Sequence, residues 1–90
     1  MTTILILVKI KSADKFDDYT EPMFFRVLNC YDYKLIDIFT DKFNKKLYYY
    51  FEGPDRIKDY MYLDIYHHLK ELIPDYAYIK KVEPKHSHSD

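Results

Sequence analysis

The amino-acid sequence predicts a small α+β fold, and three observations support this prediction. The chain has 90 residues, which is enough for one hydrophobic core but too few for two. Short apolar runs alternate with longer stretches in which apolar residues recur every three or four positions. These segments follow the order strand, helix, strand, strand, helix, strand, which is the ferredoxin-like βαββαβ arrangement. It implies a four-stranded antiparallel sheet in the order 4-1-3-2, with two helices on one face.

The first third of the chain supplies a strand and a helix. Residues 3–10, TILILVKI, are apolar on both faces until Lys9, which is typical of a central strand. Residues 12–30 carry an apolar stripe at helical spacing, formed by Phe16, Tyr19, Met23, Val27 and Cys30. A proline does not fit a helix interior, so we expect the helix to restart near Thr20 with Pro22 in its first turn.

The middle of the chain supplies a β-hairpin. Residues 33–40 and 46–52 are predicted to be strands, because both are rich in β-branched and aromatic residues. The polar link DKFNK between them has hairpin length. Gly53 then ends the second strand, and Pro54 is expected near the first position of the following helix.

The last third supplies a helix and the fourth strand. The helix is expected to end at Pro74 and to bury one stripe, formed by Ile57, Met61, Ile65, His68, Leu69 and Leu72. Residues 76–82 are the predicted last strand. Residues 1–84 would then form a single domain, and residues 85–90 a mobile polar tail.

The composition excludes several classes of function. With 14 Lys and Arg residues against 15 Asp and Glu, the chain has neither a broad basic field nor the acidity of a DNA mimic. Gly53 is the only glycine, so the chain has no phosphate-binding loop and no dinucleotide fingerprint. Cys30 is the only cysteine, which excludes an intramolecular disulfide, and we expect it in the core. The first apolar run is too short to span a bilayer, and the chain has no signal peptide, so a cytoplasmic protein is expected.

No residue pattern identifies a catalytic or metal site. His67 and His68 are adjacent on the second predicted helix, so they point about 100° apart and do not chelate one ion together. His86 and His88 form an H-x-H pair without a third ligand. No nucleophile is paired with a base in the sequence. We therefore expect no catalytic residue, no metal and no cofactor, although an enzyme is not excluded.

The stretch KLYYYFE, residues 46–52, holds the strongest signal for binding. Because side chains alternate along a strand, we expect Leu47, Tyr49 and Phe51 to face the helices. Tyr48 and Tyr50 then lie on the open face of the sheet, and a contiguous apolar patch there would mark an interaction site. The residues that we expect to bind a partner are these two tyrosines with Phe39, Tyr78 and Lys9, and on the second helix Tyr62 and Tyr66.

Three interpretations of this face compete. Rigid tyrosines on a strand are good anchors for a partner protein, because they bury a large area at low entropic cost. Alternatively, Lys46, Tyr48 and Tyr50 resemble the third-strand motif of RNA-recognition domains, a likeness that implies RNA binding. The third interpretation is self-association, because ferredoxin-like chains of this length often pair sheet against sheet, and a homodimer is expected. The layout of a strand, KFDDY, a hairpin and a proline-started helix also resembles that of dimeric α+β-barrel families, which implies an enzyme or small-molecule site within such a dimer.

The leading hypothesis is a non-catalytic protein-binding module. Tyr, Ile, Lys, Asp and Phe are abundant and have mostly AT-rich codons, whereas Ala occurs only at positions 13 and 77. This composition is common in genes of viruses and mobile elements, although an AT-rich bacterium or archaeon would share it. Within the class of binding modules, the sequence therefore suggests an inhibitor of a host machine, of the anti-CRISPR or a similar anti-defence type.

Overall fold

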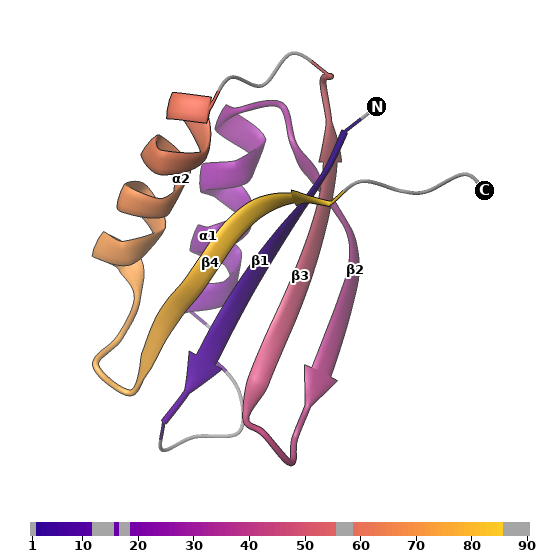
Figure 1. Ribbon diagram of the computed structural model, residues 1–90. Helices are drawn as coiled ribbons and strands as arrows, with labels where there is room; N and C mark the ends of the chain where they lie inside the picture. Colours follow the sequence, from indigo (N-terminus) through magenta and orange to yellow (C-terminus); the bar gives the residue numbers. More distant parts are fainter. Residues whose placement is uncertain (1, 12–15, 17–18, 56–58, 86–90) are drawn as a thin grey trace, which may run out of the picture.

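A single antiparallel sheet with two helices on one face makes up the molecule. The computed structural model describes residues 2–11, 16, 19–55 and 59–85. Along the chain, its elements are β1 (Thr2–Ile10), α1 (Thr20–Cys30), β2 (Lys34–Asp41), β3 (Lys46–Gly53), α2 (Asp59–Leu72) and β4 (Ala77–Lys85). The strand order is β2-β3-β1-β4, and both helices lie on the same side (Figure 1). This confirms the predicted α+β class and strand order, because 4-1-3-2 is the same order counted from the other edge.

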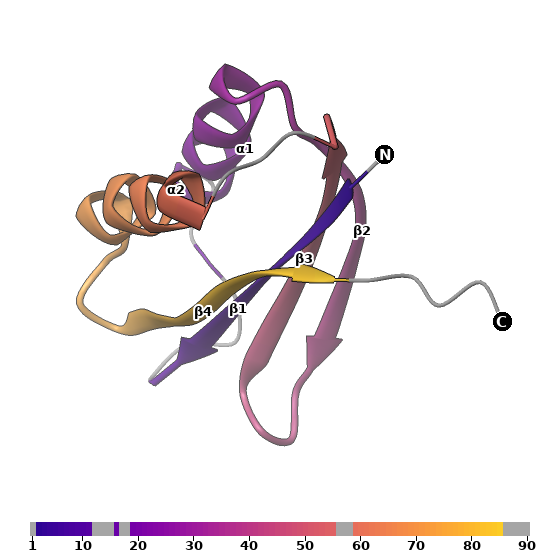
Figure 2. The ribbon, with the colours of Figure 1, turned by 45° about the horizontal axis from the view of Figure 1, so that its top comes forward.

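The helices and the sheet form two layers around one core. Strand β1 is central and pairs antiparallel with β3 on one side and β4 on the other. Its helix-facing side chains are almost fully buried and comprise Ile4, Ile6, Val8 and Ile10. Helix α2 packs over β4, and α1 packs against α2 and toward β2, which leaves the opposite face of the sheet without a helix (Figure 2).

An aromatic cluster fills the core between β3 and α1. Its centre is the fully buried Tyr49, the middle one of three consecutive tyrosines. The ring centroids of Phe16, Phe24 and Phe25 lie 6.3, 6.0 and 6.3 Å from that of Tyr49. The ring of Phe51 lies 6.5 Å away along the same strand. The helix-facing set of the tyrosine strand therefore fills the core, as its alternation predicted.

Helix α1 begins where its proline predicts but buries a different stripe. It starts at Thr20 with Pro22 in the first turn, where a missing N–H costs no intrahelical bond. Its buried residues are Thr20, Phe24 and Leu28. The predicted stripe was wrong at Tyr19 and Cys30, which are exposed, whereas Phe16 is buried and Val27 packs against the core, as predicted. The predicted start of the helix, at residues 12–15 and 17–18, lies outside the described residues.

The C-terminus of α1 is closed by backbone hydrogen bonds around a left-handed residue. The N–H of Asp32 donates to the carbonyl of Asn29 (3.0 Å), and the N–H of Tyr33 donates to that of Leu28 (2.9 Å). Asp32 has a φ of 65°, the conformation that this motif requires after the helix. Because glycine usually holds this position, Asp32 carries a conformational cost there.

The end of β3 lies against the residue that precedes β2. A Cβ atom on Gly53 would lie 2.7 Å from Cγ of Tyr33 and 2.8 Å from the carbonyl oxygen of Asp32. The hydroxyl of Tyr33 donates to the carbonyl of Pro54 at 2.7 Å, which fixes the ring over the glycine. Space rather than backbone conformation requires glycine here, since no glycine has a positive φ.

The described part of helix α2 runs from Asp59 to Leu72 and buries a narrower stripe than predicted. Residues 56–58 lie outside the described residues, so the place of Pro54 near the start of this helix stays a prediction. Ile65 and Leu69 are fully buried, whereas His68, predicted to pack in the core, is exposed. Ile57 and the predicted tail, apart from Lys85, lie outside the described residues. Strand β4 continues to Lys85, through Pro84.

Candidate functional site

The sheet face without helices, called the open face below, is organised in four rows that cross the strands. The pairing register sets the residues of each row side by side. The first row contains Lys34, Glu52 and Thr3, and the second contains Asp37, Tyr50, Leu5 and Glu83. The third row contains Phe39, Tyr48, Leu7 and Lys81, and the fourth contains Asp41, Lys46, Lys9 and Tyr78.

An apolar platform occupies the middle of the open face. Leu5 and Leu7 are only 8% and 6% exposed, although they face away from the helices. Their neighbours on β3, Tyr50 and Tyr48, are partly exposed. Phe39 on β2 extends the platform, with its ring centroid 5.6 Å from that of Tyr48, and it is 57% exposed. The tyrosines and Phe39 are therefore the side chains that a bound partner would touch.

Charges of both signs surround this platform. Lys9 donates its ammonium group to the carbonyl of Asn44, and Lys81 forms an ion pair with Glu83 at 3.2 Å. Tyr78, which is partly exposed, lies under the ammonium group of Lys11, 5.5 Å from the ring centroid. The rows contain acidic as well as basic residues, so the open face has no continuous basic stripe.

The structure brings together five of the seven residues predicted to bind a partner. Tyr48, Tyr50, Phe39, Tyr78 and Lys9 lie in the second, third and fourth rows of the open face.

Tyr62 and Tyr66 lie elsewhere. Both are partly buried on α2 and pack against the core. They line an open groove between α2 and β4 with Lys80 and Lys81. The exposed apolar side chains of α2 are instead Tyr60 and Leu63. The predicted second contact surface therefore differs in its residues from the exposed side of this helix.

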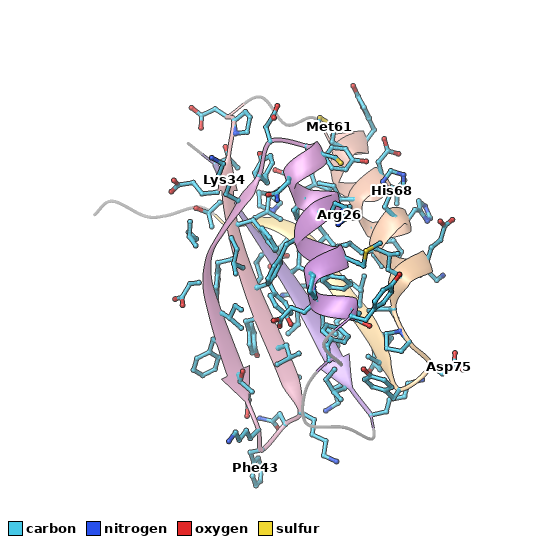
Figure 3. All side chains as sticks on the ribbon, turned by 180° about the vertical axis from the view of Figure 1, so that it is seen from behind. Arg26, Lys34, Phe43, Met61, His68 and Asp75 are labelled. Atoms are coloured by element: carbon cyan, nitrogen blue, oxygen red, sulfur yellow. The ribbon has the colours of Figure 1, made fainter. Side chains whose placement is uncertain are left out.

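Strand β2 presents an apolar surface of which sequence reasoning identified only Phe39. Among the described residues, eight large apolar side chains are exposed, and four of them belong to β2 and the turn after it. These four, called the β2 edge surface below, are Ile36, Ile38, Phe39 and Phe43. Phe43 stands at the tip of the hairpin and is 94% exposed (Figure 3). Two sequence signals, the edge position of this strand and its apolar residues on both faces, would have identified this surface.

The two edge strands of the sheet differ in protection. Strand β4 is covered by α2 and carries a proline at position 84, an irregular register after Leu7 and several lysines. These features hinder the pairing of an edge strand with another chain. Strand β2 has an irregular register between Leu35 and Asp37, and the Asp37 carboxylate accepts the backbone N–H of Ile38 at 2.9 Å. The exposed residues of this strand include the apolar Ile36, Ile38 and Phe39.

The junction of α1 and α2 holds the chain's most reactive residue types. The hydroxyl of Tyr31 and Nδ1 of His68 are 3.1 Å apart. Burial raises the pKa of the Tyr31 hydroxyl, with smaller contributions from the charges of Asp64 and Cys30. Cys30 is exposed, so its predicted place in the core was wrong. Within the described ranges, no three His, Cys, Asp or Glu side chains are close enough to hold a metal ion together.

A second groove lies where β3 ends and β2 begins. It is open to solvent, and its lining includes the acidic residues Asp32, Glu52 and Asp55 and the apolar residues Leu35, Ile36 and Pro54. The Asp55 carboxylate at its rim accepts a hydrogen bond from the hydroxyl of Thr2 at 3.2 Å. This groove is a recess in the protein surface beside the β2 edge surface.

Comparisons of the chain with protein-family models, with curated proteins and with solved structures gave no match. Among the helices that the structure describes, none is long and apolar enough to cross a membrane.

Proposed function

We propose that this chain is a non-catalytic protein-binding module with a ferredoxin-like fold, and that it binds a partner protein through the β2 edge surface. The observation that carries this proposal is the concentration of exposed apolar side chains on one edge strand. Ile36, Ile38 and Phe39 are 53%, 38% and 57% exposed in a strand that has only one neighbour. Apolar exposure of this kind is typical of interaction sites.

The unpaired backbone edge of β2 favours binding of an extended segment of the partner. A strand that pairs on one side only presents unpaired backbone groups, to which another chain adds as a further strand. Thr40 and Ile38 pair with the helix-facing residues of β3, whereas Phe39 pairs with Tyr48 on the open face. An added strand would therefore cover apolar side chains on both faces of the sheet. Its own alternate apolar residues would give specificity.

The charge distribution favours a protein partner over RNA. Binding of a nucleic-acid backbone depends on Lys and Arg that are available to phosphates. On the open face Lys81 is paired with Glu83, and Lys46 has Asp41 as its neighbour on β2. An RNA strand along the tyrosines would also meet the carboxylates of Asp37 and Glu83. The RNA-recognition hypothesis loses support for this reason.

The small-molecule alternative lacks an enclosed site on the open face. A dimeric α+β-barrel enzyme needs a pocket between the sheet and its partner that places a base or nucleophile near the ligand. Among the residues that the structure describes, the middle of the open face holds Leu5, Leu7 and two tyrosines and no histidine. Its chemistry suits contact with another protein better than proton transfer.

Within the class of binding modules, composition still suggests an inhibitor of a host machine encoded by a virus or mobile element. An anti-CRISPR or other anti-defence protein of this kind acts by occupying a surface, which requires no catalytic group. This narrower proposal rests on the sequence alone.

A capture experiment with matched variants tests the binding proposal. Tagged wild type, Ile38→Lys and Leu63→Lys would be expressed in a native-like host, and captured proteins would be identified after nuclease treatment. Both substituted side chains are exposed, so both variants should fold. We expect wild type and Leu63→Lys to retain the same partner, and Ile38→Lys to lose it.

Hydrogen exchange in the captured complex locates the contact. An added strand should slow exchange of the β2 amides that face away from β3. A partner that remains bound to Ile38→Lys at the wild-type level, or is lost with nuclease treatment, would contradict the proposal.

A further inference from the structure

The four rows of the open face are complementary to a copy of themselves. The first row carries Lys34 and Glu52 on β2 and β3, and the fourth carries Asp41 and Lys46 on the same strands, with the signs reversed. In the two middle rows, Glu83 and Lys81 lie on β4 with opposite signs. A rotation that exchanges the first row with the fourth, and the second with the third, therefore sets each of these charges opposite its counterion.

We propose that a second copy of this chain packs on the open face about a two-fold axis that runs across the strands, between the second and third rows. Each strand then faces its own counterpart, which runs in the opposite direction. Packing of two sheets with strands roughly aligned is one of the common arrangements of β-sheets. A two-fold interface uses the same surface on both copies, so every pair across it occurs twice.

Three ion pairs define the register of this dimer. Lys34 lies opposite Asp41 of the second copy, and Glu52 lies opposite Lys46. Glu83 lies opposite Lys81 of the second copy, so the ion pair that these two residues form within each copy joins a cluster of four charges. Each pair forms twice by symmetry. Such pairs at the edge of an interface contribute mainly to specificity and orientation.

The middle of the interface is apolar. Tyr50 lies opposite Tyr48 of the second copy, and Leu5 lies opposite Leu7. The partly exposed tyrosines supply most of the contact, since both leucines are already nearly buried. Asp37 lies opposite Phe39 at the β2 side, where the carboxylate keeps its bond to the Ile38 N–H and meets solvent.

The other arrangement of the open faces with aligned strands has its two-fold axis along the strands, and charge disfavours it. That axis exchanges β3 with β1 and β2 with β4 within each row. It would place Lys46 opposite Lys9 and Asp37 opposite Glu83. Like charges in contact cost several kcal/mol in total, so the axis across the strands is favoured.

The size of the face sets the strength of the dimer. Four strands about 4.8 Å apart and four rows about 7 Å apart cover roughly 500 Å² of each copy. The total of about 1,000 Å² lies at the low end for specific interfaces, so we expect a dimer that dissociates on dilution. This inference goes beyond the proposed function, because a face-to-face dimer leaves the backbone edge of β2 accessible from the side.

Two single charge reversals test the register. In the Lys46→Glu dimer, the new glutamate faces Glu52 of the other copy, so two contacts between like charges replace two ion pairs. In the Glu52→Lys dimer, the new lysine faces Lys46 of the other copy, with the same result. We expect each variant alone to dimerise about tenfold more weakly than wild type, measured by analytical ultracentrifugation. An equal mixture of the two variants regains both ion pairs in the mixed dimer, and so does the double variant Lys46→Glu with Glu52→Lys. Arg26→Glu on the exposed side of α1, behind the sheet, is the matched control (Figure 3).

Each outcome decides the proposal. Recovery of dimer mass in the mixture and in the double variant, with Arg26→Glu unchanged, supports the register. A wild type that stays monomeric at hundreds of micromolar overturns it, and so does a mixture that stays as weak as its components. Circular dichroism of each variant confirms folding, and the mixture uses the same folded proteins. Loss of the dimer would leave the test of partner capture with Ile38→Lys unaffected, so the two proposals fail independently.

Discussion

The hydroxyl of Tyr49 donates a hydrogen bond of 2.8 Å to Oε2 of Glu21 and so ties the middle of β3 to the first turn of α1. Tyr49 is fully buried among phenylalanine rings, and Glu21 is half-buried. A carboxylate in the first turn also interacts favourably with the positive end of the helix dipole. The one polar group of the aromatic core thus holds the helix layer in register with the sheet.

Removal of the Glu21 carboxylate and removal of the Tyr49 hydroxyl should both lower the free energy of unfolding, but by different amounts. Glu21→Ala leaves the Tyr49 hydroxyl buried without its acceptor, which costs about 1–3 kcal/mol of the free energy of unfolding. Tyr49→Phe removes the hydroxyl itself and leaves Glu21 able to reach water, so it should cost about 1 kcal/mol. Urea denaturation of both variants measures the difference. Equal stability of Glu21→Ala and wild type would show that the hydrogen bond contributes nothing.

The same pair should make the stability fall at alkaline pH. Burial raises the pKa of the Tyr49 hydroxyl well above its ordinary value of 10.0, and the hydrogen bond and charge of Glu21 raise it further. The folded state therefore holds this proton more tightly than the unfolded chain does. The stabilisation is complete below about pH 10 and is lost progressively as the pH rises above that value.

Comparison of wild type with Tyr49→Phe isolates this effect. Tyr31 and Tyr33 also have raised pKa values, but both proteins share them. Between about pH 10 and 11, the free energy of unfolding of wild type should fall more steeply, by up to about 1.4 kcal/mol per pH unit. Parallel pH profiles of the two proteins would refute the assignment.

The sequence predicted the sheet better than the helices, and the aromatic residues explain why. Alternation in KLYYYFE separates Tyr48 and Tyr50 from Tyr49 without any knowledge of the rest of the fold. In α1, two adjacent stripes at helical spacing are both apolar. One stripe ends at Cys30, and the other contains Phe24 and Leu28. Choosing between them requires the position of the first turn, which depends on contacts with the sheet. The predicted stripe of α1 is therefore shifted by one residue from the stripe that is buried.

Gly53 marks a second contact that sequence alone did not reveal. Its proximity to Tyr33 means that Gly53→Ala must displace the ring or the Asp32 carbonyl. We expect a loss of about 1–3 kcal/mol in the free energy of unfolding, the usual cost of overpacking. Glu52→Ala, a substitution at the neighbouring position of β3, is the control and should have a smaller effect. Thermal unfolding of the two variants provides the measurement, and an unchanged midpoint for Gly53→Ala would contradict the contact.

Of the β2 edge surface, only Phe39 was predicted to bind a partner, although further signals were present in the sequence. The predicted strand order already made residues 33–40 an edge strand, and Ile36 and Ile38 lie within that range. The alternation of β3 favoured Tyr48 and Tyr50 instead, whose side chains are only partly exposed. Exposure depends on which strand the helices fail to cover, and this follows from packing that a sequence pattern does not specify.

Asp32 offers a stabilising substitution. Its φ of 65° lies in the left-handed region, where glycine has no steric cost. Asp32→Gly should raise the free energy of unfolding by about 0.5–1 kcal/mol, because both backbone hydrogen bonds that close α1 are kept. Asp32→Ala keeps the strain and loses the polar side chain, so it should be less stable than wild type. A glycine variant less stable than the alanine variant, by urea denaturation, would rule out this explanation.

Asp37 protects the exposed edge of β2 by accepting the backbone N–H of Ile38. An added strand must compete with this carboxylate for the donor, so Asp37→Ala should make strand addition to β2 easier. We expect faster amide exchange at Ile38 and a higher rate of aggregation, followed by hydrogen exchange and light scattering at high protein concentration. Asp75→Ala removes a carboxylate from the exposed loop before β4 and is the matched control for net charge (Figure 3). Equal aggregation of the two variants would mean that charge, rather than release of the edge, governs the behaviour of β2.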